Sequence, residues 1–373
     1  MKDVERRLVK VVRKLVRRVL GIMAREKVLV IGNPVYPSRL VAEAFYQESL
    51  RMGSSATLLW QKARTMEKPM EQTVREAIVA NPDVVIAASQ KSLGHDSAGR
   101  LKPYRGSSGE AFNNILYFLR AQKKLRAFWF PLPCLERFVE TASVDYDRMG
   151  RLSLAIKKRV DRAEKVRIRT KYGTDLVLVK DDRQARCNYD GDSSRPGSGG
   201  NLPMGEVFVT PVAGGAHQGD VVVDVSLFIK GRTYSVGKEP IYLRVEDGFV
   251  KEIKGGRVAR ILSAAVKEAE ERPIKLHKEG RLSKIMAKTN SRNARNIGEV
   301  AVGVNPKAKI VGDLIEDEKV YGTAHIAIGA GQYDGDPAFI HVDCVINRPE
   351  VSLIYPSGKE EVILKGRKFQ FSY

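Results

Sequence analysis

Residues 28–33 have the sequence VLVIGN, an apolar run that ends in a glycine and an asparagine. Short apolar runs bounded by turn residues are typical of strands buried on both faces of a sheet. Segments with helical spacing alternate with three further runs of this kind. The expected strands are 28–31, 56–60, 83–88 and 127–130, and the expected helices are 37–52, 71–80 and 109–121. This alternation predicts an α/β domain with a parallel sheet.

The turn after the first strand argues against a dinucleotide as the ligand of this domain. A dinucleotide-binding domain has a GxGxxG fingerprint there, whereas this chain continues with Gly32-Asn33-Pro34. The sequence also contains no P-loop.

The pattern changes near Val166, where most later segments have the character of strands. Residues 166–170 and 175–179 flank a short turn and predict a hairpin. The further strands are expected at 206–212, 220–229, 240–246, 299–304, 321–328, 338–346, 351–355 and 361–369, with helices at about 256–271 and 280–290. We therefore predict a two-domain protein. Residues 1–165 form the α/β domain with a basic N-terminal helix, and residues 166–373 form a strand-rich α+β domain.

Composition limits the class of protein. The 373 residues are 43% hydrophobic and 29% charged, which is a globular composition. Three well-separated cysteines exclude a disulfide scaffold, and no CxxC pair is present for zinc. No apolar run approaches the roughly 18 residues of a membrane span, and the first 24 residues lack the apolar core of a secretory signal. We expect a cytoplasmic protein, and the many Lys, Arg and Glu residues also suit a thermophilic one.

The formal net charge of +20 raises nucleic acid or an anionic membrane surface as partners. Residues 1–24 predict an amphipathic basic helix that could make such a contact. The alternative, which we favour, is that its apolar face packs on the first domain while its charged face is solvated.

The residues competent to bind metal are few. His341 and Asp343 lie two apart in an expected strand, so both side chains project from the same face. An imidazole and a carboxylate placed together supply part of a metal site, although such a pair can also be an ordinary hydrogen bond.

Three other charged groups lie in apolar strands, where they are costly unless paired or metal-bound. They are Glu206, Glu299 and His325. Small residues follow Glu299 and His325 on the same face, which leaves room for ions and substrate. The alternative is that the two glutamates are strand-end carboxylates that face water.

Four segments resemble, in order, the motifs of the thermophilic metalloaminopeptidases, of the aminopeptidase T and aminopeptidase S type, also labelled leucyl aminopeptidases in archaea. The segments are 201–208, 296–306, 322–329 and 340–343. The hairpin at 172–175 is also similar, and the resemblance covers about residues 166–346. In the first domain only the architecture is similar.

The resemblance implies a two-metal peptidase and a homodimer. The ligands carried over by motif are Glu206, Glu299, His325, His341 and Asp343. The ions would be Zn, Co or Mn, with a water between them activated for attack on a peptide bond. It further implies that Glu206 or Glu299 is the general base and that Tyr333 donates to the oxyanion, with Glu318 as an extra carboxylate.

We accordingly predict a metal-dependent aminopeptidase that removes N-terminal residues from peptides. Two alternatives remain open at this point. One is a catalytically altered, metal-binding relative that acts as a binding module, and the other is a basic nucleic-acid-associated protein. The other histidines, His95, His217 and His277, are expected in exposed loops, and Cys344 on the face opposite to Asp343.

Overall fold

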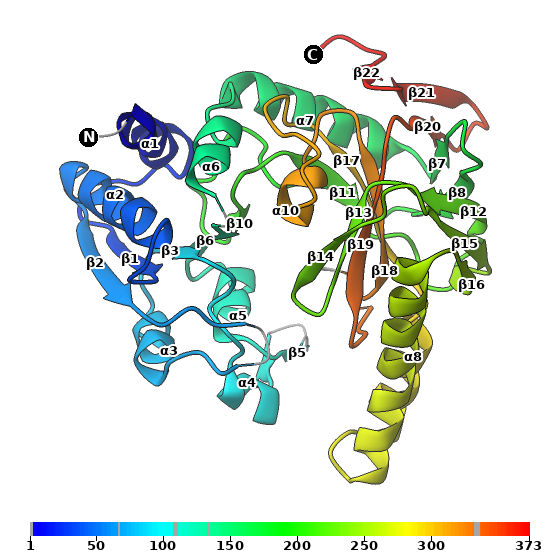
Figure 1. Ribbon diagram of the computed structural model, residues 1–373, viewed down its shortest axis with the longest axis horizontal. Helices are drawn as coiled ribbons and strands as arrows, with labels where there is room; N and C mark the ends of the chain where they lie inside the picture. Colours follow the sequence, from blue (N-terminus) through cyan, green and yellow to red (C-terminus); the bar gives the residue numbers. More distant parts are fainter. Residues whose placement is uncertain (1–2, 66–67, 107–110, 133, 332–335) are drawn as a thin grey trace. The chain divides into compact units, whose positions relative to one another are not determined.

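A computed structural model describes residues 3–65, 68–106, 111–132, 134–331 and 336–373. The chain divides into two compact units (Figure 1). The first contains Met1–Gly150 and Asn188–Met204, and the second contains Arg151–Cys187 and Gly205–Tyr373.

The division differs from the predicted boundary after residue 165 in two places. Residues 151–165, which include most of helix α7 (Tyr146–Arg162), belong to the second unit. Residues 188–204 return to the first unit because the short strand β10 (Gly199–Asn201) pairs with β6 (Arg126–Pro131). Hydrophobic periodicity cannot show such a return, since β10 consists of two glycines and an asparagine.

The first unit is built on a parallel sheet of five strands, as the alternation of segments predicts. Its order is β10-β6-β3-β1-β2, and every described pairing is parallel. The remaining bounds are β1 Lys27–Gly32, β2 Ser55–Trp60 and β3 Val84–Ser89. All six residues of β3 are buried, which is why its first five residues are apolar rather than alternating with polar ones; only the last residue, Ser89, is polar.

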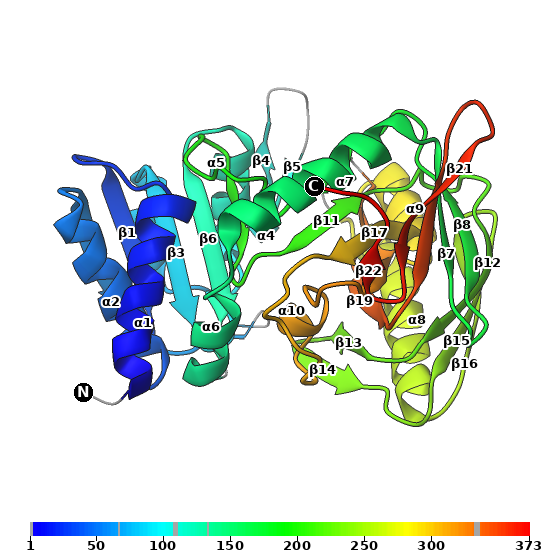
Figure 2. The ribbon, with the colours of Figure 1, turned by 90° about the horizontal axis from the view of Figure 1, so that it is seen from above.

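Helices lie on both faces of this sheet (Figure 2). Helix α2 (Ser38–Arg51) contacts β1, β2 and β3, and α1 (Asp3–Lys14) lies outside it, against α2 and α6 (Leu135–Thr141). Helices α3 (Gln72–Val79) and α5 (Ile115–Ala121) pack together on the other face, with the short α4 (Ser97–Leu101) and the β4–β5 ladder (Tyr104–Arg105, Ala111–Phe112) nearby in the chain.

The basic N-terminal helix buries its apolar face within the first unit. Leu8, Val11 and Val12 of α1 and all three apolar residues of the following π-helical turn (Leu15–Val19) are buried. The structure therefore shows the alternative that we favoured, in which the apolar face of this helix packs on the first domain. Part of its basic face is also paired, since Arg17 bonds to Glu48.

One predicted helix of this unit starts later than expected. The expected helix at 109–121 begins at Ile115, where the Asn114 side chain accepts a hydrogen bond from the Leu116 N–H and caps the helix. Residues 111–112 are a strand, and residues 107–110 lie outside the described residues.

A buried arginine holds the N-terminal segment to the parallel sheet. Arg126, at the start of β6, is 2% exposed and donates to the carbonyls of Leu20, Gly21 and Ser194 while pairing with Glu26.

Arg126→Met should lower the free energy of unfolding by roughly 3–5 kcal/mol, because these acceptors lose their donor and Glu26 loses its counter-charge. Urea unfolding measures the loss. The matched variant Lys124→Met, at an exposed neighbour, should change it by less than about 0.5 kcal/mol. A loss below about 1 kcal/mol for Arg126→Met would contradict this role.

The second unit contains two antiparallel sheets. The seven-stranded sheet has the order β14-β13-β19-β18-β17-β11-β9, and the eight-stranded sheet has the order β16-β15-β12-β8-β7-β20-β21-β22. The first of these comprises β9 Arg186–Cys187, β11 Glu206–Val209, β13 Ser226–Ile229, β14 Arg232–Ser235, β17 Ile297–Gly303, β18 Ala324–Gly329 and β19 His341–Ile346. The second comprises β7 Lys165–Arg169, β8 Asp175–Val179, β12 Gln218–Val223, β15 Ile241–Glu246, β16 Phe249–Lys254, β20 Glu350–Ile354, β21 Glu360–Lys365 and β22 Lys368–Phe369.

Several expected elements of this unit have other bounds in the structure, and the strand at 220–229 and the helix at 256–271 differ most. The expected strand at 220–229 is two strands, β12 and β13, which belong to different sheets. Helix α8 (Arg257–Lys278) continues seven residues beyond its expected end at 271 and passes through the buried Pro273. It packs along α9 (Lys284–Asn293), and the pair extends away from the sheets in Figure 1. This packing outweighs the tendency of proline to end a helix.

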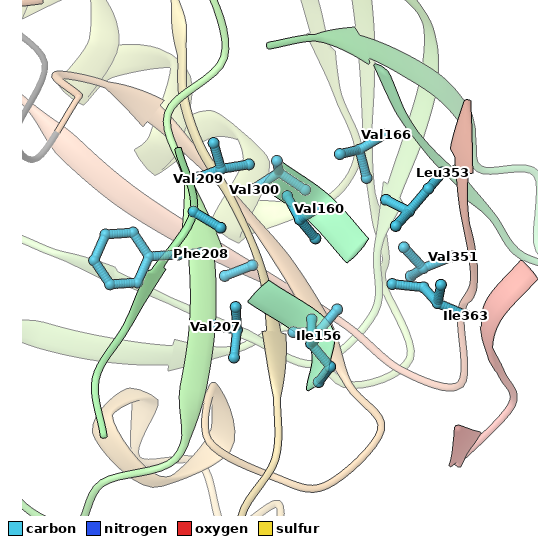
Figure 3. Close-up of a pocket in the computed structure, with 13 residues that line it drawn as sticks. Ile156, Val160, Val166, Val207, Phe208, Val209, Val300, Val351, Leu353 and Ile363 are labelled. Carbon is cyan, nitrogen blue, oxygen red and sulfur yellow. The ribbon is translucent and has the colours of Figure 1, made fainter. Parts of the chain in front are cut away.

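One face of the seven-stranded sheet is closed by apolar packing. Val207, Val209, Val300 and Val302 lie with residues of α7, β7 and β20 around a gap of about 20 Å³ (Figure 3). Its lining is apolar and it has room for about one water, so it is a packing gap in the core rather than a ligand site. Chemistry on this sheet therefore belongs to the other face.

Candidate metal centre

Strand register places the charged residues of the sheet on that other face. Residues directly opposite each other in antiparallel strands project from the same side. Glu299 in β17 is opposite Ala327 in β18, which is opposite Asp343 in β19. The small side chain of Ala327 thus lies between two carboxylates and leaves space between them.

The remaining groups lie in neighbouring rows of the same face. His325 is opposite Ala301, Gly329 is opposite His341, and Glu206 is opposite Gly303. Each of these three charged residues therefore has an alanine or glycine across the ladder. The sequence pattern favours such a hollow by alternating charged and small residues along the strands.

The first group of candidate ligands contains Glu299, His341 and Asp343, whose ligand atoms lie within 4.8 Å of one another. His341 Nε2 lies 3.1 Å from Asp343 Oδ1 and 3.9 Å from Glu299 Oε2. The His341 side chain is 26% exposed, whereas that of Glu299 is buried. The group therefore reaches solvent on one side.

Two features of this group fit a cation. The Nδ1 atom of His341 lies 2.8 Å from the Ala330 carbonyl oxygen, so that Nδ1 carries the proton and Nε2 is left as the ligand atom. Among the described residues, no donor hydrogen-bonds to the buried Oε2 atom of Glu299. A buried carboxylate oxygen without a donor is costly unless a cation approaches it.

The second group contains Glu206, Glu318 and His325. His325 Nε2 lies 3.7 Å from Glu206 Oε2 and 3.3 Å from Glu299 Oε1, so its imidazole lies between the two groups. Glu318 follows the short helix α10 (Leu314–Asp317) as its C-terminal cap. The next residue, Lys319, is fully buried and pairs with both Glu206 and Glu318.

Burial and charge shift the pKa values of these groups in opposite directions. Burial above all, together with neighbouring carboxylates, raises the pKa of Glu299 above its ordinary range and that of Glu318 to about 8. Burial would lower the pKa of each histidine, but the nearby carboxylates raise it, to about 9 for His325 and about 10 for His341. Burial would raise the pKa of Asp343, but His341 above all lowers it to about 2.

These shifts predict how metal affinity depends on pH. Without metal, both imidazoles are in the protonated, positively charged form at pH 7. A metal ion that binds both must therefore displace one proton from each. The logarithm of the Mn²⁺ affinity should therefore rise by about two per pH unit between pH 6 and 8. The stability of the metal-free chain should change with pH in the opposite direction, because it depends on ion pairs between the protonated imidazoles and the carboxylates. These ion pairs stabilise it fully below pH 6.5 and are lost as the pH rises through 9 to 10.

Competition titrations with a chelator at pH 6, 7 and 8 measure this slope. A flat profile would show that the imidazoles are already neutral before the metal arrives.

The structure thus brings together all five residues proposed as ligands, namely Glu206, Glu299, His325, His341 and Asp343. Glu318, proposed as an extra carboxylate, is also in the cluster. Tyr333, proposed to donate to the oxyanion, lies outside the described residues. Lys319 was missed, and its only signal in the sequence is a lysine next to a glutamate.

The other histidines and Cys344 are not members of either ligand group. His217 is buried rather than exposed, because its Nδ1 accepts from the Val179 N–H and its Nε2 lies 2.6 Å from the Val212 oxygen. His277 is in helix α8 rather than a loop, and His95 lies in the first unit. Cys344 is buried on the opposite face from Asp343, as expected.

The fold and the clustered ligands are those of an enzyme scaffold with a candidate metal centre. A family model described as NicX, 2,5-dihydroxypyridine 5,6-dioxygenase, matches residues 135–325, just over half of the chain. The chain belongs to this family.

Two solved structures share the fold over almost their whole length. The 2,5-dihydroxypyridine dioxygenase from Pseudomonas putida KT2440 has a TM-score of 0.69 at 15% identity, covering 99% of this chain and 98% of that one. Wild-type AmpT, aminopeptidase T, from Thermus thermophilus has a TM-score of 0.66 at 17% identity, covering 98% of this chain and 100% of that one. A comparison with curated proteins finds no match.

These findings correct the predicted function. The resemblance to the metalloaminopeptidases holds for the fold, as the likeness to AmpT shows. The predicted aminopeptidase activity is wrong, because the family model and a matching structure are those of a dioxygenase. The physical reason is that the four motifs specify strands with inward carboxylates and imidazoles, and this donor set suits more than one reaction.

No helix within the described residues is both long and apolar enough to cross a membrane.

Proposed function

We propose that this protein is a metal-dependent dioxygenase that opens the ring of a small hydroxylated aromatic compound. The observation that carries the proposal is the convergence of two imidazoles on one buried carboxylate. His325 Nε2 faces Oε1 of Glu299, and His341 Nε2 faces Oε2 of the same group. The family of the chain supports the choice of reaction.

The donor set agrees with this reaction class. Two histidines and one carboxylate with open positions are the ligands typical of non-haem Fe(II) oxygenases. His325, His341 and either Glu299 or Asp343 would supply them. An Fe(II) ion held there would supply the redox chemistry that activates O₂.

The protein's own groups would bind and orient the substrate. The partly exposed His341 and Asp343 mark the side from which a small ring can approach the centre. The apolar packing on the other face of the sheet keeps water from reaching the centre through the sheet.

The test is oxygen uptake by the metal-loaded chain. The metal-free protein is loaded with Fe²⁺ under nitrogen and mixed with oxygenated 2,5-dihydroxypyridine, and with a panel of other dihydroxylated pyridines and benzenes. We expect one molecule of the ring compound, followed by its absorbance, to be consumed for each O₂ taken up, without an added reductant. Lack of uptake with every ring, together with cleavage of Leu-p-nitroanilide, would overturn the proposal.

A further inference from the structure

The buried ammonium of Lys319 pairs with two carboxylates of the second ligand group. Its side chain is 0% exposed, and Nζ is 2.7 Å from Glu206 Oε1 and also bonded to Glu318 Oε1. Glu206 and Glu318 are two of the three members of the second ligand group. The positive charge between them is thus already supplied by the chain.

Among the described residues, the first ligand group is paired with imidazoles rather than with an ammonium, and an imidazole can give up its proton and become a ligand when an ion binds. No described donor bonds to Glu299 Oε2, and the imidazoles of His325 and His341 are the groups that approach this carboxylate. The two halves of the cluster therefore differ, since one has its carboxylates satisfied by an ammonium and the other is open to an ion.

We propose that Lys319 occupies the second cation position, so that the wild-type chain binds one metal ion and removal of Lys319 opens a second site. This rests on the proposed metal centre and departs from the two ions expected from the sequence. The second site would use the carboxylates of Glu206 and Glu318, beside the His325 that serves the first ion, and would take a divalent ion that prefers oxygen ligands.

Geometry and charge both support this exclusion. An ammonium and a metal ion seek the same carboxylate oxygens, and like charges in a buried site repel strongly. Removal of the ammonium leaves two buried carboxylates uncompensated, and a divalent ion is the replacement that restores their charge balance.

Equilibrium dialysis against Mn²⁺, combined with electron paramagnetic resonance, tests the proposal without using activity. The wild-type chain should bind one Mn²⁺ per chain with the six-line signal of an isolated ion. Lys319→Met should bind two, with the exchange-coupled signal of ions about 4 Å apart. Lys319→Arg keeps the charge and should remain at one ion. Lys180→Met, which removes another fully buried lysine of the same unit, should also remain at one.

A second variant keeps the proposal testable if Lys319→Met fails to fold. Glu206→Gln should still bind one Mn²⁺ with an affinity within about 10-fold of wild type, because Glu206 serves Lys319 rather than the ion. Loss of the ion in Glu206→Gln, two coupled ions in the wild type, or a folded Lys319→Met with one ion would each overturn the role of Lys319. A wild-type chain that binds no Mn²⁺ would overturn the metal centre itself.

Discussion

His341→Ala is expected to abolish oxygen uptake by the Fe²⁺-loaded chain and to weaken metal binding by more than about 100-fold. Loss of a group that only orients a ligand typically costs 10–100-fold, and His341 would be a ligand itself. Its Nε2 faces both Asp343 and Glu299, and its Nδ1 is held by the Ala330 carbonyl. Oxygen uptake and Mn²⁺ dialysis, performed on the same preparation, measure the two effects.

The matched control is His277→Ala, which removes a histidine from helix α8. It should leave both metal binding and oxygen uptake near wild type. Retention of a full complement of metal by folded His341→Ala would place the ion elsewhere and contradict the assignment of this residue.

Ala327→Leu is expected to remove metal binding while leaving the chain folded. Ala327 lies between Glu299 and Asp343 in the same cross-strand row, so a leucine side chain there would fill the space between the two carboxylates. Overpacking of a buried position also lowers stability by typically 1–3 kcal/mol. Mn²⁺ dialysis and urea unfolding separate the two consequences.

Ala324→Leu is the control for overpacking. Ala324 is in the same strand and equally buried, but it lies three positions before Ala327, so it projects from the opposite face. It should lose a similar amount of stability and keep its metal. Equal loss of metal in both variants would show that strain in β18, rather than filling of the site, is responsible.

The parts of the fold that follow from local pattern could be predicted. The apolar run at 28–31 and its successors predict the parallel sheet because strands covered by helices on both faces must be apolar throughout. Period-two alternation places Glu299 with Ala301 and Gly303 on one face of β17, and the ladder then aligns them with His325 and Asp343.

The parts that depend on long-range placement could not be predicted. Glu318 and Lys319 follow a helix of four residues, and no periodicity tells where such a short element packs. Strand β10 joins the parallel sheet through backbone pairing alone, and α8 continues through Pro273 because α9 packs along it.

The reaction could not be predicted either. Imidazoles and carboxylates on neighbouring strands bind ions for oxygen chemistry and for hydrolysis alike. Residue types at Glu206, Glu299, His325, His341 and Asp343 therefore indicate a metal centre without choosing the bond that breaks. Lys319 is the residue that distinguishes the two halves of the centre, and its partners become visible only in three dimensions.

The most direct test of the central claim is isotope labelling of the product. The Fe²⁺-loaded chain is given 2,5-dihydroxypyridine, or whichever ring of the panel it consumes, under ¹⁸O₂ in ordinary water and then under ¹⁶O₂ in H₂¹⁸O. If the chain is a metal-dependent dioxygenase, the ring-opened product should contain two oxygen atoms from O₂, before any exchange with solvent. An intact ring under ¹⁸O₂, or a product labelled only from water, would contradict the account.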